Sequence, residues 1–198
     1  DLGQKSVVDL TLANIYFSYV DRTMGAEAYA NIANSAEYPK LSRAYAMLFV
    51  ADQFDGFQDK NLLRPFFSVE EFNGKSKEIL IKDLYQKIYN MHPFGLAAGQ
   101  LAFQLLETYK GVAIPDKDFD IIERYIEDIN NNLPELETTD PFKSYIPVTI
   151  LMKAGLFRLI ENAGKIPKES VEELYLLAIT RARTLGVSAT EQYSILLY

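Results

Sequence analysis

The sequence predicts an all-α fold of stacked antiparallel helical hairpins, and three observations lead to that prediction. Apolar residues recur at three- and four-residue spacing along nearly the whole chain, as in helices that bury one face. Prolines and glycines fall between these periodic segments, where helices begin and end. No segment shows the apolar–polar alternation of a half-buried strand. We therefore expect a single helical domain over residues 1–198, forming a short α-solenoid or a helical bundle.

The expected helices follow one another along the chain. The first covers the apolar series from Val7 to Val20, and an alanine-rich helix begins after Gly25. The helix expected over 40–55 follows Pro39, a residue that suits a first helical turn, and it is apolar nearly all round, which indicates a central position. The remaining expected helices cover 75–91, 94–110, 116–133, 142–162 and 168–185.

Helix ends and close contacts can also be predicted from single residues. The tract "NNN" at 130–132 is expected to end a helix, because asparagine tolerates the left-handed C-cap. His92 before Pro93, and Asp140 before Pro141, are expected to cap the helices that follow them. Two glycines inside helical patterns are expected to let another helix approach closely; they are Gly99 and Gly155. Ser188 and Glu191 form a capping-box pattern that begins a last helix.

A pair of short sequence patterns that occurs twice along the chain predicts that the helical hairpins are repeated. "HPF" at 92–94 and "IPDKDFDII" at 114–122 are followed, 48 and 52 residues later, by "DPF" and "IPKESVEEL". The two offsets differ by about one helical turn, so both copies can keep the same facing. We therefore expect hairpins at 40–91, 92–133 and 140–186. The alternative is that helices begun by proline resemble one another for physical reasons alone.

Composition excludes several classes of function. The net charge of −7 and the lack of a Lys/Arg cluster exclude nucleic acid as a partner. The chain has no cysteine and one histidine, which excludes thiolate and multi-histidine metal sites. No apolar run reaches the ~18 residues of a transmembrane segment. We expect a soluble, acidic domain with no catalytic residue, metal site or cofactor assigned.

The stretch "ADQFDGFQDKNLL" (51–63) carries the sharpest candidate site. Asp52, Asp55 and Asp59 stand at i, i+3 and i+7, and on a continuous helix they would share a face that holds Mg²⁺ on a diphosphate. The competing interpretation is that the helix ends here, with Gly56 in the left-handed cap. The aspartates would then lie near the negative helix end, where a cation such as Arg43 would relieve them; Lys60 and Arg64 are the other candidates.

A family resemblance falls on the same region. "RAYAMLFVADQFDG" (43–56), with Arg43, Tyr45 and Phe54 in matching positions, resembles a helix of SusD-like glycan-binding lipoproteins, and "SKEILIKDL" (76–84) resembles the helix that follows there. Asp55 and Gly56 stand in reverse order relative to that family, and the rest of the chain does not match it. The resemblance implies a tetratricopeptide-like scaffold, an exported periplasmic or surface-anchored lipoprotein, and glycan binding without catalysis, with Arg43 and Tyr45 as candidate ligand contacts.

The sequence as a whole predicts a non-enzymatic helical binding or scaffolding module, whose ligand is a peptide, a protein or a glycan. The alternative is a Mg²⁺-dependent all-α enzyme that acts on a diphosphate through Asp52, Asp55 and Asp59.

Overall fold

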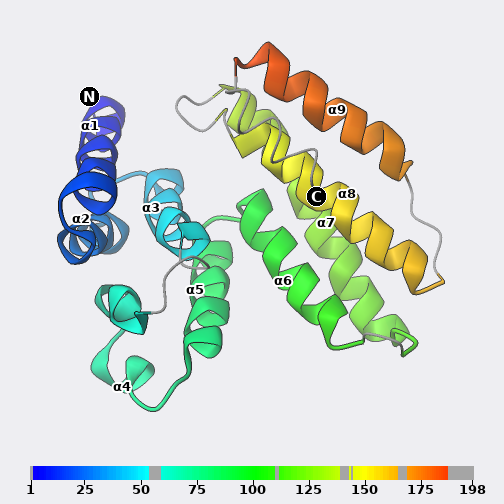
Figure 1. The fold of residues 1–198 in the computed structure, drawn as a ribbon, viewed down its shortest axis with the longest axis horizontal. Helices are drawn as coiled ribbons and strands as arrows, with labels where there is room; N and C mark the ends of the chain where they lie inside the picture. The colour runs from blue at the N-terminus through cyan, green and yellow to red at the C-terminus, as the bar shows by residue number, and fades with distance from the viewer. Residues whose placement is uncertain are drawn as a thin grey trace. The chain divides into compact units, whose positions relative to one another are not determined.

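The protein is all-α, as the sequence predicts. The computed structural model describes residues 2–53, 59–109, 112–138, 143, 145–164 and 169–186, and these contain helices packed on one another and no strand. They fall into two compact units, residues 1–92 and 93–198, each of which is described by itself (Figure 1). Along the described chain, no helix is long and apolar enough to cross a membrane.

The first unit is built around α2 and α3, which pack on each other and on their neighbours (Figure 1). Helix α1 and the π-helical turn η1 lie against α2, while α3 packs on α5. An aromatic cluster joins these layers, because Phe17 of η1 contacts Tyr29 of α2 and Phe49 of α3. The elements of this unit are α1 (Leu2–Ile15), η1 (Tyr16–Val20), α2 (Arg22–Asn34), α3 (Lys40–Gln53), η3 (Lys60–Phe66), α4 (Val69–Phe72) and α5 (Lys77–Met91).

Helix α2 begins in a way that fixes η1 against it. The carboxylate of Asp21 accepts a hydrogen bond from the backbone N–H of Met24, which caps the helix. At Gly25, a Cβ atom would lie 2.3 Å from the Cα of Phe17. Only glycine therefore lets the backbone of η1 lie directly on α2 and bring Phe17 into the core.

The part of the second unit that the structure describes contains four long helices. Helix α6 packs on α7 and α8, α7 packs on α8, and α8 packs on α9. Large side chains that are fully buried form its core; they are Phe94, Ile122, Ile129, Leu136 and Leu156. The bounds are α6 (Gly95–Glu107), α7 (Asp116–Thr138), α8 (Tyr145–Asn162) and α9 (Val171–Thr184). The predicted hairpin repeats and the predicted single domain stay predictions.

The tract at 130–132 does not end its helix, and the prediction there is wrong. Helix α7 continues through Asn132 and Pro134 to Thr138. Asn132 is buried, and its Oδ1 accepts a hydrogen bond of 2.9 Å from the backbone N–H of Gly95, at the first turn of α6. On the same helix Ile129 and Leu136 are fully buried on either side of this tract, so tertiary packing overrides its local preference.

The expected capping role of His92 is also wrong. His92 is the C-terminal cap of α5, where its backbone N–H donates to the carbonyl of Ile88. The N-cap of α6 is Phe94, which makes no side-chain capping hydrogen bond. Instead the side chain of Asn132, on α7, accepts the hydrogen bond of a backbone N–H in the first turn of α6. Asp140, Ser188 and Glu191 lie outside the described residues.

Gly99 and Gly155, the two glycines inside helices, differ in how closely another helix approaches them. At Gly99 a Cβ atom would lie 2.3 Å from Cγ of Met152, so α8 approaches α6 closely there, as expected. At Gly155 no atom lies within 4 Å of the position a Cβ would take, and the expected close approach is wrong.

Candidate binding surface

The predicted aspartate site is divided between two elements. Asp52 is exposed in the last turn of α3, and Asp55 and Gly56 lie outside the described residues. Asp59 has an extended backbone and caps η3, where its Oδ1 accepts a hydrogen bond of 2.9 Å from the N–H of Asn61. The spacing predicted that Asp52 and Asp59 share one helical face. They do not, because Asp59 is not on the helix that carries Asp52.

Arg43 and Tyr45, the other predicted site residues, make contacts within the first unit. The Nε of Arg43 donates a hydrogen bond of 2.8 Å to the carbonyl of Ala33, which satisfies a carbonyl at the C-terminal end of α2. Tyr45 is half-buried, with its ring tilted against Phe49 at 6.5 Å between centroids. Lys60, expected near the aspartates, donates to the carbonyl of Lys75 instead.

The acidic side chains that the structure describes do not form a metal site. Within the described ranges, no group of three or more His, Cys, Asp or Glu side chains is placed to hold a metal ion.

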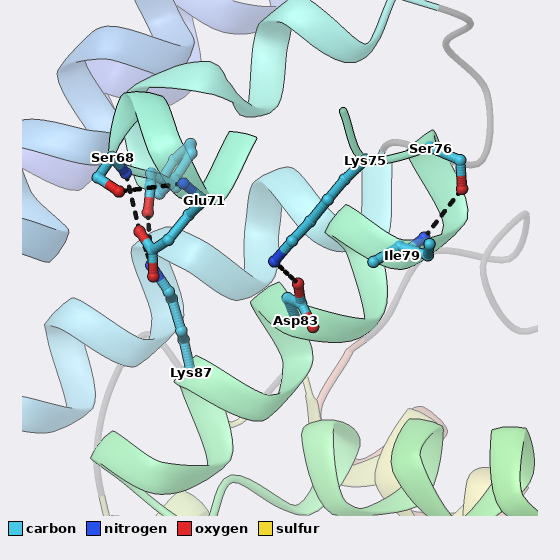
Figure 2. Close-up of polar contacts among 8 residues, drawn as sticks. Ser68, Glu71, Lys75, Ser76, Ile79, Asp83 and Lys87 are labelled. Carbon is cyan, nitrogen blue, oxygen red and sulfur yellow. Dashed lines mark hydrogen bonds and ion pairs between the residues drawn. The ribbon is translucent and has the colours of Figure 1, made fainter. Parts of the chain in front are cut away.

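A network of lysines and carboxylates joins α4 to α5 (Figure 2). Glu71 forms a capping box with Ser68 and an ion pair of 3.0 Å with Lys87. Its pKa lies below the usual value, first because the backbone N–H of Ser68 donates to it and then because of Lys87. Beside it, Lys75 pairs with Asp83 at 2.6 Å (Figure 2). These charges satisfy one another, so the network holds the connection after η3 against α5.

Helix α1 and η1 are apolar on two opposite faces. One face, with Leu10, Ala13 and Phe17, is buried against the rest of the first unit. On the opposite side, spaced by four, three and four residues, lie side chains that are between 44% and 84% exposed. They are Val8, Leu12, Ile15 and Tyr19, and we call them the α1 outer face. A helix needs one apolar face to pack on its own domain, so a second, opposite apolar face is available for another partner.

The α1 outer face carries almost no charge. Between Ser6 and Val20 the only ionisable acid or base other than tyrosine is Asp9, whose carboxylate accepts a hydrogen bond of 2.6 Å from the hydroxyl of Tyr38. This bond raises the pKa of Tyr38 to about 12. Other large apolar side chains that are exposed on α1, η1 and the start of α2 are Val7, Tyr16, Val20 and Met24.

The second unit offers no comparable stripe among its described residues. Its exposed large apolar side chains are spread over α6, α8, α9 and the segment before α7, and only the two on α9 adjoin in sequence. They are Phe103, Val112, Val148, Leu176 and Leu177. Single exposed apolar residues are ordinary on protein surfaces, whereas a continuous apolar face on one helix indicates an interaction site.

The sequence predicted a helix over the apolar series from Val7 to Val20 without dividing it into a buried and an exposed face, so the α1 outer face was missed. The available signal was the number of apolar positions, because a helix with a single buried face does not need all of them. Comparison of the chain with protein-family models, with curated proteins and with solved structures found no match.

Proposed function

We propose that this protein is a non-enzymatic helical module that binds another protein through the α1 outer face. The observation that carries the proposal is the second apolar face of α1, exposed while the opposite face of the same helix is packed in the core. Burial of apolar surface is the main driving force of protein association, at roughly 25 cal/mol per Å².

The chemistry of the face favours a protein over a glycan. Val8, Leu12 and Ile15 offer no hydrogen-bonding side chain, and a sugar presents hydroxyl groups that need donors and acceptors. Tyr19 combines a large apolar ring with one hydroxyl, and it belongs to the residue types enriched in the cores of protein interfaces.

The charges of α1 and of the whole chain make an anionic membrane surface a poor partner for this face. Amphipathic helices that bind such membranes carry Lys and Arg beside the apolar face. Here Lys5 is the nearest basic residue along α1, it pairs with Glu37 at 3.6 Å, and the chain as a whole has a net charge of −7.

The proposal is tested by selecting helical peptides that bind the chain from a displayed library of amphipathic sequences. We expect binders with apolar anchors at helical spacing, weakened at least ~30-fold by Leu12→Asp, which is the effect of a ~2 kcal/mol hot spot. Leu177→Asp is the matched control, because Leu177 is 44% exposed and Leu12 is 47% exposed. Equal binding to both variants would contradict the proposal.

A thermal melt distinguishes the competing functions. A ligand present at a hundred times its Kd adds about 2.7 kcal/mol to the free energy of unfolding. We expect a selected peptide to raise Tm, and neither Mg²⁺ with inorganic diphosphate nor neutral oligosaccharides to do so. A rise with Mg²⁺ and diphosphate would favour an enzyme acting through the aspartates around 52–59, and a rise with a sugar would favour a glycan-binding module.

A further inference from the structure

We infer that the partner of the α1 outer face is a second copy of this chain, with the two α1 helices packed antiparallel about a two-fold axis. This inference rests on the proposed function and names the occupant of the same surface. Three features of the four residues of this face, which we also call the stripe, carry it: their spacing, their lack of charge and the size of the surface they expose.

The spacing of the stripe is the same read in either direction. Val8, Leu12, Ile15 and Tyr19 are separated by four, three and four residues, so the midpoint lies between Leu12 and Ile15. In an antiparallel pair centred there, Leu12 of each copy faces Ile15 of the other, and Val8 faces Tyr19. A two-fold interface uses one patch on both subunits, so a stripe with this symmetry is self-complementary.

The same spacing fits the seam of two interlocking helices. On α1 the steps of four and three residues from Val8 to Ile15 average 3.5, the repeat at which side chains of paired helices interlock, and Tyr19 follows on the π-helical turn η1. The middle of the seam would hold two leucines and two isoleucines, while the smallest side chain of the stripe meets the largest at each end. Large residues placed opposite small ones fill such an interface without voids.

The charge pattern removes the main obstacle to pairing between identical surfaces. Two copies of an acidic chain repel each other, and like charges placed opposite cost several kcal/mol at an interface. The stripe has no ionisable acid or base, and the carboxylate of Asp9 beside it is hydrogen-bonded to Tyr38. A partner recognised by charge would find no complementary group along this face.

The size of the surface suits a dimer of moderate stability. The stripe together with Tyr16 and Val20 exposes on the order of 600 Å² of side chain, estimated from the exposed fractions and from typical side-chain areas. Two such surfaces together reach roughly 1,200 Å², the lower end of specific, stable interfaces. We therefore expect dissociation in the micromolar range.

Sedimentation equilibrium of the full chain, over a wide range of concentrations, measures the association. We expect a monomer–dimer equilibrium that Leu12→Asp shifts at least ~30-fold toward monomer and that Leu177→Asp leaves unchanged. Leu12→Gln adds no charge and serves as the second variant. Circular dichroism confirms that each variant is folded, as expected for a half-exposed position.

Spin labels give the orientation, because the chain has no cysteine and a single introduced cysteine is unique. Asn14 and Gln4 are both exposed on α1. In the antiparallel dimer, labels at Asn14→Cys lie near the two-fold axis, while labels at Gln4→Cys are separated by about 28 Å along the helix direction, from 1.5 Å per residue. A parallel dimer gives similar distances at both sites.

Each result decides the inference. A dimer that responds to Leu12→Asp alone and has the antiparallel distances supports it. A wild-type chain that stays monomeric, a dimer that Leu12→Asp and Leu12→Gln do not weaken, or equal label distances would overturn it. If the chain is monomeric and yet binds helical peptides through Leu12, the second copy is the wrong occupant and the proposed function stands.

Discussion

The triple asparagine of α7 allows a sharp test of the packing, because its three members differ in one respect. Asn132 is 4% exposed and accepts a hydrogen bond from the N–H of Gly95, whereas Asn130 and Asn131 are exposed. Replacing Asn132 by alanine removes the only described side-chain cap of the first turn of α6 and leaves the N–H of Gly95, a buried residue, without this acceptor.

The expected loss of stability follows from two known terms. Removing a helix cap costs about 0.5–2 kcal/mol, and a buried donor left without an acceptor costs about 1–3 kcal/mol. These terms describe the same lost bond, so we expect Asn132→Ala to lower the free energy of unfolding by about 1–3 kcal/mol. Asn130→Ala and Asn131→Ala should change it by a few tenths or raise it slightly, because alanine has the higher helix propensity.

Amide hydrogen exchange measured by NMR separates this effect from general destabilisation. We expect Asn132→Ala to lower the protection of the Gly95 amide by about fivefold or more, since 1.4 kcal/mol corresponds to a factor of ten and the expected loss begins at about 1 kcal/mol. Urea unfolding gives the global change for the same three variants. Equal effects of the three substitutions, or unchanged protection at Gly95, would refute the role of Asn132 as a cap between helices.

Three further predictions test other contacts. Gly99→Ala should lower the free energy of unfolding by about 1–3 kcal/mol in urea titrations, because its Cβ would overlap a side chain of α8, while Gly155→Ala should raise it by about 1 kcal/mol. The free energy of unfolding should fall between pH 10 and 12, where the unfolded state loses a proton that Tyr38 still holds, and Tyr38→Phe should reduce that fall in pH-dependent melts. Glu169→Gln should destabilise more than Lys153→Met in the same urea assay, by about 1–3 kcal/mol, because it leaves a buried ammonium without its carboxylate partner at 2.5 Å.

Helix positions were predictable from the sequence where the apolar periodicity and the prolines and glycines between helices indicated the same bounds. The expected helix over 75–91 is α5 (Lys77–Met91), and the one over 94–110 is α6 (Gly95–Glu107). The end of α7 was not predictable, because the local preference of three asparagines and of Pro134 favours a stop. Tertiary contacts, which local sequence does not contain, override that preference: Ile129 and Leu136 are buried, and Asn132 accepts a hydrogen bond from Gly95, 37 residues away.

The candidate site was less predictable, for two physical reasons. The spacing of Asp52 and Asp59 fits one helical face only if the helix continues, and Asp59 instead caps η3 with an extended backbone. The apolar pattern of α1 showed that Leu10 and Leu12 both belong to apolar faces, but periodicity does not tell which face packs inside. Only the three-dimensional structure distinguishes the buried Leu10 from the exposed Leu12.

Hydroxyl-radical footprinting of the α1 outer face tests most directly that this face is a docking surface. Tyr19, 84% exposed, is the readout, and Leu176 on α9, 65% exposed, is the internal control. The side-chain oxidation rates are compared in dilute chain, in concentrated chain and in chain saturated with a selected peptide. We expect the oxidation of Tyr19 to fall severalfold on association while that of Leu176 stays constant. Tyr19 oxidation that remains unchanged in every associated state would contradict the account.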